Sequence, residues 1–163
     1  MSVLIREAVP DDVPTMAQIR AAGAWTGGAA ADVMARYLAG EHHPQHALAP
    51  RAMFVAVYGE SLLGFIAGHH TRRFECRGEL QWLFVPVEQR GTGLADRLFE
   101  RMALWFASHE AVHVCVNVEP RNIAARRFYA RHGARDLNSY WMVWSDITEL
   151  TSPSAVSSAP AGQ

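Results

Sequence analysis

The stretch Leu80-Gln-Trp-Leu-Phe-Val-Pro-Val-Glu-Gln-Arg-Gly-Thr-Gly-Leu-Ala95 decides how the chain folds. Its apolar first half predicts a strand over Leu80 to Val85, and Pro86 ends that strand because proline cannot donate to a sheet. A glycine-rich turn follows, and a helix is expected to begin at Leu94. The first N–H groups of a helix have no partner inside it, and this end of the helix dipole is positive. The turn is therefore typical of a site for an anion such as a phosphate.

The glycine spacing limits the class of ligand that the turn is expected to bind. A dinucleotide-binding turn requires G-x-G-x-x-G, but Asp96 stands where the third glycine belongs after Gly91-Thr92-Gly93. This departure argues against NAD. A glycine-rich turn that binds nothing remains open at this point, because short glycine motifs also arise by chance.

The second informative segment is Asn122-Ile-Ala-Ala-Arg-Arg-Phe-Tyr-Ala-Arg-His-Gly133. Asn122 is a good N-cap for a helix, and Gly133 suits the left-handed position after its end. At helical spacing Asn122, Ala125 and Tyr129 share one face. This stripe could line a ligand site, or Tyr129 could be a core aromatic with its hydroxyl at the rim.

The rest of the chain predicts one domain over residues 1–150. We expect strands over 3–8, 53–58, 62–69, 112–118 and 140–144, helices over 13–22, 30–38, 94–108 and 122–133, and a loop over 42–50. On the helix over 94–108, Ala95, Leu98, Met102 and Trp105 form the expected inward face. The order β-α-α-β-β-β-α-β-α-β-β indicates α/β architecture around a mixed sheet. Residues 151–163 are expected to be a disordered tail.

Composition excludes several classes of protein. The 163 residues are 50% hydrophobic and carry a net charge of −1, so bulk attraction to nucleic acid or an anionic membrane is not expected. All 15 basic residues are arginine, which excludes a Schiff-base lysine and the lysine of a P-loop. No apolar run is long enough to span a bilayer, and the N-terminus does not resemble a secretion signal. With only Cys76 and Cys115, we expect a cytoplasmic protein.

Taken together, R-x-x-G-x-A at a helix start and a later N-x-x-A-x-x-F-Y-x-x-x-G resemble the GNAT superfamily of acyl-CoA-dependent N-acetyltransferases. The resemblance covers about residues 3–147 and is strongest over 79–133. It implies a single GNAT-like domain with a mixed, mostly antiparallel sheet of six or seven strands. The sheet would be splayed around an acyl-CoA groove and flanked by about four helices.

The resemblance also implies roles for individual residues, with acetyl-CoA as the co-substrate. The residues that match cofactor-binding positions are Leu83, Phe84 and Val85 along the pantetheine arm, Arg90, Gly91, Thr92, Gly93, Leu94 and Ala95 at the pyrophosphate, and Asn122. Tyr129 matches the residue that protonates the departing thiolate. Glu79 matches a catalytic glutamate of some members and could act directly or through water. Alternatively, Glu79 is an edge carboxylate that pairs with Arg77 or Arg72 in solvent.

The acceptor is expected to be a small-molecule or peptide amine, and a homodimer stays open because members often dimerise. Asn117 occupies the position at which other members carry a glutamate. Trp25 falls where the first two helices would form an acceptor lid. One alternative is a non-catalytic acyl-CoA-binding module. The other is a metal or nucleic-acid protein that uses the loop His42-His43-Pro44-Gln45-His46 and the arginine-rich helix over 122–133. We expect no metal, nucleic-acid or membrane partner.

Overall fold

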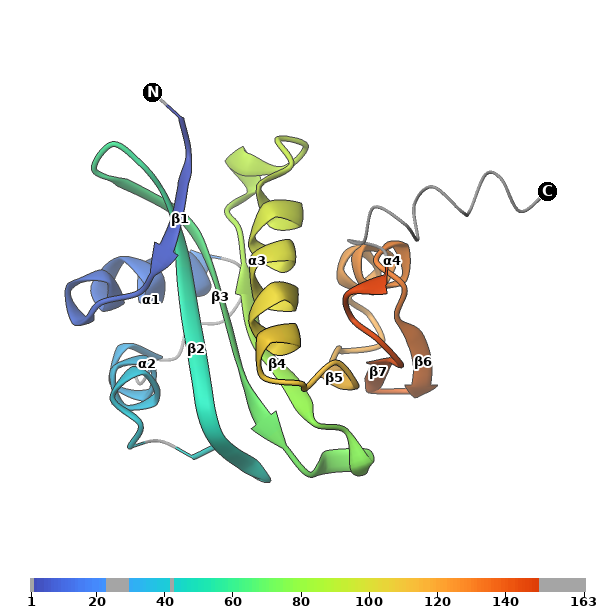
Figure 1. The fold of residues 1–163 in the computed structure, drawn as a ribbon. Coiled ribbons are helices and arrows are strands. Elements are labelled where there is room, and N and C mark those ends of the chain that lie inside the picture. The colour runs from blue at the N-terminus through green and yellow to red at the C-terminus, as the bar shows by residue number, and fades with distance from the viewer. Residues whose placement is uncertain (1, 23–29, 42, 150–163) are drawn as a thin grey trace.

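The computed structural model describes residues 2–22, 30–41 and 43–149. The expectations for Trp25 and for the tail over 151–163 lie outside these residues. The strands are β1 Leu4–Glu7, β2 Ala47–Tyr58, β3 Ser61–Thr71, β4 Gly78–Phe84, β5 Val114–Asn117, β6 Arg135–Asn138 and β7 Trp141–Trp144. The α-helices are α1 Val13–Ala22, α2 Ala30–Ala39, α3 Leu94–Ser108 and α4 Ile123–Arg131 (Figure 1). The predicted order of strands and helices is confirmed.

One seven-stranded sheet organises these elements, in the order β1-β2-β3-β4-β5-β7-β6. Every neighbouring pair is antiparallel except β4 and β5, which run parallel. A parallel pair needs a crossover connection, and α3 supplies it. The mixed, mostly antiparallel sheet and the four α-helices confirm the expected fold.

Helices cover both faces of the sheet (Figure 1). α1 and α2 bury Met16, Met34 and Tyr37 against one face, together with Phe65 and Trp82 of the sheet. α3 and α4 lie on the other face, over a larger core. Burial of this apolar surface is the main stabilising contribution to the fold.

The buried face of α3 differs from the prediction. Its buried residues are Leu94, Leu98, Phe99, Met102, Ala103 and Phe106. Leu98 and Met102 are confirmed, whereas Ala95 and Trp105 are only half-buried. The helix is rotated about its axis relative to the predicted orientation, because Phe99 and Phe106 place two aromatic rings in the core. Phe106 packs closely over Gly78. Trp105 instead packs at the rim against the ring of His109.

Several element boundaries also differ. β2 begins at Ala47, so the predicted loop over 42–50 is wrong in its second half. The register shifts between Leu48 and Arg51, and this irregularity accommodates Pro50, which has no N–H to donate to the ladder. β4 includes Glu79 and ends at Phe84 rather than Val85. β5 is four residues long, which is shorter than the predicted strand over 112–118. Among the described residues, no helix is long and apolar enough to cross a membrane.

Candidate active site

The two parallel strands at the centre of the sheet separate along their length. β4 and β5 pair only at Gly78, Glu79 and Leu80, and Leu80 opposite Val116 is the last pair. On its other edge β4 stays paired with β3 as far as Phe84. Beyond Leu80 the β5-facing edge of β4 therefore has no strand partner within the described part of the chain. The splay predicted from the resemblance is present, and Leu83 and Phe84 lie along it.

The glycine turn follows directly from this open edge. Gly91 and Gly93 have φ of +79° and +83°, a left-handed region that strains any residue with a Cβ. A Cβ built on either residue would meet no atom within 4 Å, so space is open in front of the turn. The glycines are therefore required by backbone conformation, and the open space leaves the backbone accessible to a ligand.

Several amides at this turn are free to bind an anion. The N–H groups of Val85, Gly91, Gly93, Ala95 and Asp96 donate to no acceptor in the part of the chain that the structure describes. Three of these residues stand at the N-cap and first turn of α3, where a helix attracts anions. A diphosphate fits this donor set. The exposed Thr92 closes the turn locally, because its hydroxyl donates to the carbonyl of Gln89 at 2.6 Å.

Asn122 caps α4 as predicted. Its Oδ1 accepts from the N–H of Ala125 at 3.1 Å, and the side chain is exposed. The side-chain carbonyl is used in the cap, so the amide NH₂ is the part that could reach a cofactor. Gly133 has φ of +99° just after the helix, as its position predicted.

Tyr129 lies on α4 with its ring in the core. The ring meets Trp144 edge-on with 5.5 Å between ring centroids and is 7% exposed. The hydroxyl has no hydrogen-bond partner among the described residues and is not closed off from solvent. Burial raises the pKa of Tyr129 above its usual range, so the phenol stays protonated at neutral pH. A protonated phenol without a partner can donate its proton to a ligand.

Ion pairs fix α4 relative to α3. Asp96 at the start of α3 accepts from Arg131 at 2.9 Å and lies 2.7 Å from His132. Burial raises the pKa of this carboxyl, but the hydrogen bonds from His132 and Arg131 outweigh burial and lower it. The contacts hold the helix that carries Tyr129 beside the helix that follows the glycine turn.

Glu79 is buried on the face of the sheet that α1 and α2 cover. Its Oε1 accepts from Arg73 Nε at 3.2 Å and lies 3.3 Å from Thr71 Oγ1. His69 Nε2 is 3.7 Å from the same oxygen, within ion-pair range but beyond hydrogen-bond distance. Burial raises the pKa of Glu79, but His69 and Arg73 outweigh burial, so the pKa lies below its usual range. The partner is Arg73, rather than Arg77 or Arg72, and the pair is not in solvent.

The sequence did not identify Arg73 as part of this cluster. Its guanidinium lies 4.5 Å from the ring of Trp141 on β7 and donates to the carbonyl of Gln45 at 2.8 Å. The turn that carries it has left-handed backbone at Phe74 and Glu75, with φ of +55° and +62°. No periodicity in the sequence signals such a turn, and the sequence analysis named only Arg77 and Arg72 as possible partners of Glu79.

Two buried cysteines lie on the same face. Cys115 stands opposite Glu79 on β5, and it packs against Cys76 in a small buried cluster. This contact and burial raise the pKa of Cys115. A buried thiol with a raised pKa is a poor nucleophile, so the site offers no thiolate at Cys115.

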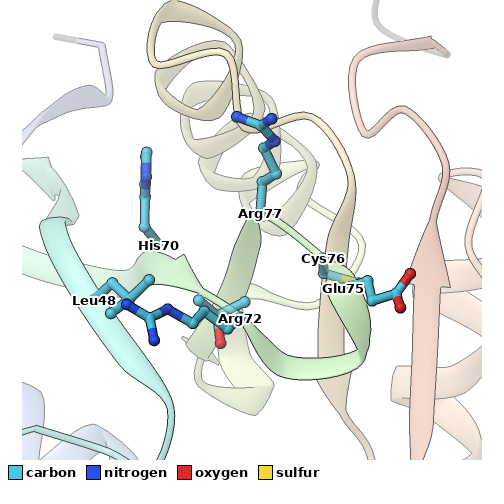
Figure 2. A pocket seen from close by; sticks show the side chains of 7 residues that line it. Leu48, His70, Arg72, Glu75, Cys76 and Arg77 are labelled. Atoms are coloured by element: carbon cyan, nitrogen blue, oxygen red, sulfur yellow. The ribbon is translucent and has the colours of Figure 1, made fainter.

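A shallow pocket of about 470 Å³ opens at the connection between β3 and β4 (Figure 2). Its labelled lining residues are Leu48, His70, Arg72, Glu75, Cys76 and Arg77. Their charged ends point in different directions, so they do not converge on one ligand. The pocket lies at the start of β4, away from the glycine turn that follows the end of this strand.

His43 and His46 are the described histidines of the histidine-rich loop. His43 Nδ1 lies 3.0 Å from Arg51 Nη2, and His42 lies outside the described residues. Within residues 2–22, 30–41 and 43–149, no group of three His, Cys, Asp or Glu side chains could hold a metal ion.

Known proteins share this fold. The profile of the Acetyltransferase (GNAT) family matches residues 25–134. A PaiA N-acetyltransferase from Thermoplasma acidophilum in complex with coenzyme A has a similar fold, with a TM-score of 0.70, 15% identity, and coverage of 89% of this chain and 99% of that one. Ard1 from Thermoplasma volcanium has a TM-score of 0.67 and 19% identity, and the match covers 88% of this chain and 97% of Ard1. The ribosomal-protein-S18-alanine N-acetyltransferase from Escherichia coli has a TM-score of 0.68 and 14% identity. That match covers 88% of this chain and 93% of the other. No curated protein sequence matches. The chain belongs to the GNAT acetyltransferase family.

Proposed function

We propose that the protein transfers an acetyl group from acetyl-CoA to a primary amine by direct attack in a ternary complex. The observation that carries this proposal is the open edge of β4 running into the free amides at the start of α3. Unpaired backbone donors along a strand and at a helix N-terminus suit an amide-containing arm that ends in a diphosphate.

Leu83, Phe84 and Val85 would pair with the pantetheine arm through their backbone. The turn formed by Arg90, Gly91, Thr92, Gly93, Leu94 and Ala95 would hold the pyrophosphate, with Asn122 contacting the cofactor from α4. When bound, acetyl-CoA supplies the thioester. Positions along the splay and at the start of α3 support the strand and turn residues, and Asn122 is supported by its place at the start of α4.

The chemistry begins with loss of a proton from the acceptor. A primary amine with a pKa near ~10 is mostly ammonium at neutral pH and cannot attack until it loses that proton. Glu79 would accept the proton, directly or through a water. All the described contacts of its carboxylate involve Oε1, and Oε2 is not closed off from solvent, which supports this role.

The amine nitrogen then bonds to the thioester carbon, and the carbon–sulfur bond breaks. The free N–H of Val85 is a candidate donor to the oxyanion. Tyr129 would give its proton to the departing thiolate, and its unpaired hydroxyl supports this assignment. The products are an amide and CoA thiol. No covalent bond to the protein is needed.

The acceptor is a small-molecule or peptide amine in our proposal. One structural neighbour is named for alanine acetylation of ribosomal protein S18, which makes protein amines a reasonable first test. We expect the enzyme to act in the cytoplasm, where reduced Cys76 and Cys115 are stable. A homodimer is compatible with this site.

A non-catalytic acyl-CoA-binding module is the second candidate, since the turn alone would suffice for binding. The experiment is a panel of amines with acetyl-CoA, read as release of CoA thiol. The panel contains small amines, aminoglycosides, and peptides with free N-termini or lysines. We expect thiol release with at least one amine. CoA binding without release for any amine would instead favour the binding module.

A further inference from the structure

His69 stands at the centre of a buried polar chain that links α2 to Glu79. Its side chain has no exposed surface. The Tyr37 hydroxyl lies 2.9 Å from Nδ1, and Glu79 Oε1 lies 3.7 Å from Nε2. Nε2 is closed off from solvent and makes no hydrogen bond among the described residues. A buried ring nitrogen without a hydrogen bond is costly, so its position beside a carboxylate needs a reason.

The tautomer of His69 follows from these contacts. If the Tyr37 hydroxyl donates to Nδ1, the ring proton is on Nε2 and is directed toward the negative carboxylate of Glu79. In the opposite tautomer the Nε2 lone pair would face that charge, which is unfavourable. Burial raises the pKa of Tyr37, so the phenol keeps the proton it donates.

We propose that His69, oriented by Tyr37, is a positioning residue that holds Glu79 in the orientation needed to deprotonate the acceptor amine. This inference rests on the proposed function, in which Glu79 is the base. Arg73, Thr71 and His69 all meet Oε1. The carboxylate is thereby held by one oxygen, and Oε2 is left for the amine or a water.

The charged and titratable groups around this cluster come from several elements. They are Tyr37 on α2, Arg51 over the Tyr37 ring at 4.7 Å, Arg73 before β4, Arg20 of α1 over the ring of Trp82, and the pair Cys76 and Cys115. Of the charged groups, Arg73 contacts Oε1 directly. Removal of His69 alone would therefore leave Glu79 ionised but held by fewer contacts.

The test compares four variants in the full-length protein. His69→Leu removes the ring, and His69→Gln restores an amide donor near Glu79 without a group that can titrate. Tyr37→Phe removes only the hydroxyl. His70→Gln is the matched control, because His70 is adjacent on β3 but its ring lies 5.8 Å from that of Trp105 on α3, on the opposite face of the sheet. The Glu79 carboxyl is titrated by carbon-13 NMR, and kcat and KM are measured with the best amine from the panel.

For His69→Leu we expect kcat to fall about 10-fold or more at unchanged KM for acetyl-CoA, because orientation rather than binding is lost. The Glu79 midpoint should rise toward its ordinary value, since His69 helps to lower it. His69→Gln should recover most of kcat, and His70→Gln should match the wild type. Tyr37→Phe should move kcat in the same direction as His69→Leu, which keeps the test valid if the leucine variant fails to fold.

The two hypotheses fail in different ways. Suppose that the wild type is active and that neither kcat nor the titration midpoint of Glu79 changes in His69→Leu and Tyr37→Phe. That result would overturn the role of His69 only. A wild type that binds CoA but releases no thiol with any amine would overturn the proposed function.

Discussion

Leu80 of β4 and Val116 of β5 form the last pair of the parallel ladder, and beyond them the two strands separate. The next residues of β4 keep their bonds to β3 on one edge and have none from β5 on the other. A row of unsatisfied backbone groups normally invites another strand. Here the row leads to the positive end of α3, and our proposal of an extended ligand that ends in phosphates rests on this combination.

Tyr129→Phe tests the proposed proton donor. The hydroxyl has no partner among the described residues, so its removal should break no internal hydrogen bond and leave the midpoint of thermal unfolding almost unchanged. We expect kcat to fall about 100-fold, as for loss of a general acid, with little change in the Kd for CoA. Steady-state thiol release near pH 8 and calorimetry measure the two effects. Equal turnover in the variant would remove Tyr129 from the mechanism.

Glu79→Gln tests the proposed base. A general base contributes about 100-fold or more, so kcat should fall by that order while CoA affinity is retained. The pKa of Glu79 lies below the ordinary glutamate value of 4.5, so the carboxylate takes up a proton only below that pH. Between about pH 6 and 9 Glu79 therefore stays ionised, and the wild-type rate should show no step that comes from titration of this carboxyl. A variant with kcat within a few-fold of the wild type would make Glu79 only the structural partner of Arg73.

Gly78→Ala tests the packing of α3 on the sheet. A Cβ at this position would lie 2.6 Å from Phe106 Cε1 and 3.2 Å from the carbonyl oxygen of Ala111. Overpacking of this kind costs about 1–3 kcal/mol of unfolding free energy, which lowers the midpoint by several degrees. Phe106→Leu in the same chain should relieve part of the clash, so the two substitutions should be less than additive. Additive effects would show that the ring is not the obstacle.

Asp96→Asn tests the link between α3 and α4. The variant should lose about 1 kcal/mol at neutral pH, because the partly exposed carboxylate gives up its pairs with Arg131 and His132. The folded-state pKa of Asp96 lies below its ordinary 3.8, so its contribution is present above that value. The difference between the two proteins in urea unfolding should shrink as pH falls below 3.8. A difference that persists at lower pH would have another origin.

The sequence was sufficient for the parts of the fold that local patterns determine. α1 and α3 begin and end at the predicted residues, and Asn122 and Gly133 occupy the predicted cap positions. These features depend on neighbours within a few residues, as capping and helix periodicity do. The predicted strand began at Leu80, so the place of Glu79 on β4 was implied by the family resemblance and not by the local pattern.

The remaining features depend on contacts between distant residues. Tyr37, His69 and Glu79 belong to three elements, and only the pairing of β3 with β4 brings His69 opposite Glu79. The predicted strand over 62–69 ended at His69, yet β3 continues to Thr71 and the rings of His69 and His70 lie on opposite faces of the sheet. The rotation of α3 also depended on the space available over Gly78, which hydrophobic periodicity does not report.

Calorimetric titration of CoA into the wild type and two Gly93 variants is the most direct test of the central claim. Gly93→Ala introduces the left-handed strain alone, at about 1–2 kcal/mol, whereas Gly93→Glu adds bulk and a negative charge in front of the free amides. We predict binding heat for the wild type, retained but weaker binding for Gly93→Ala, and no detectable binding for Gly93→Glu. Absence of heat with the folded wild type, or equal affinity in Gly93→Glu, would contradict the assignment of a diphosphate to this turn.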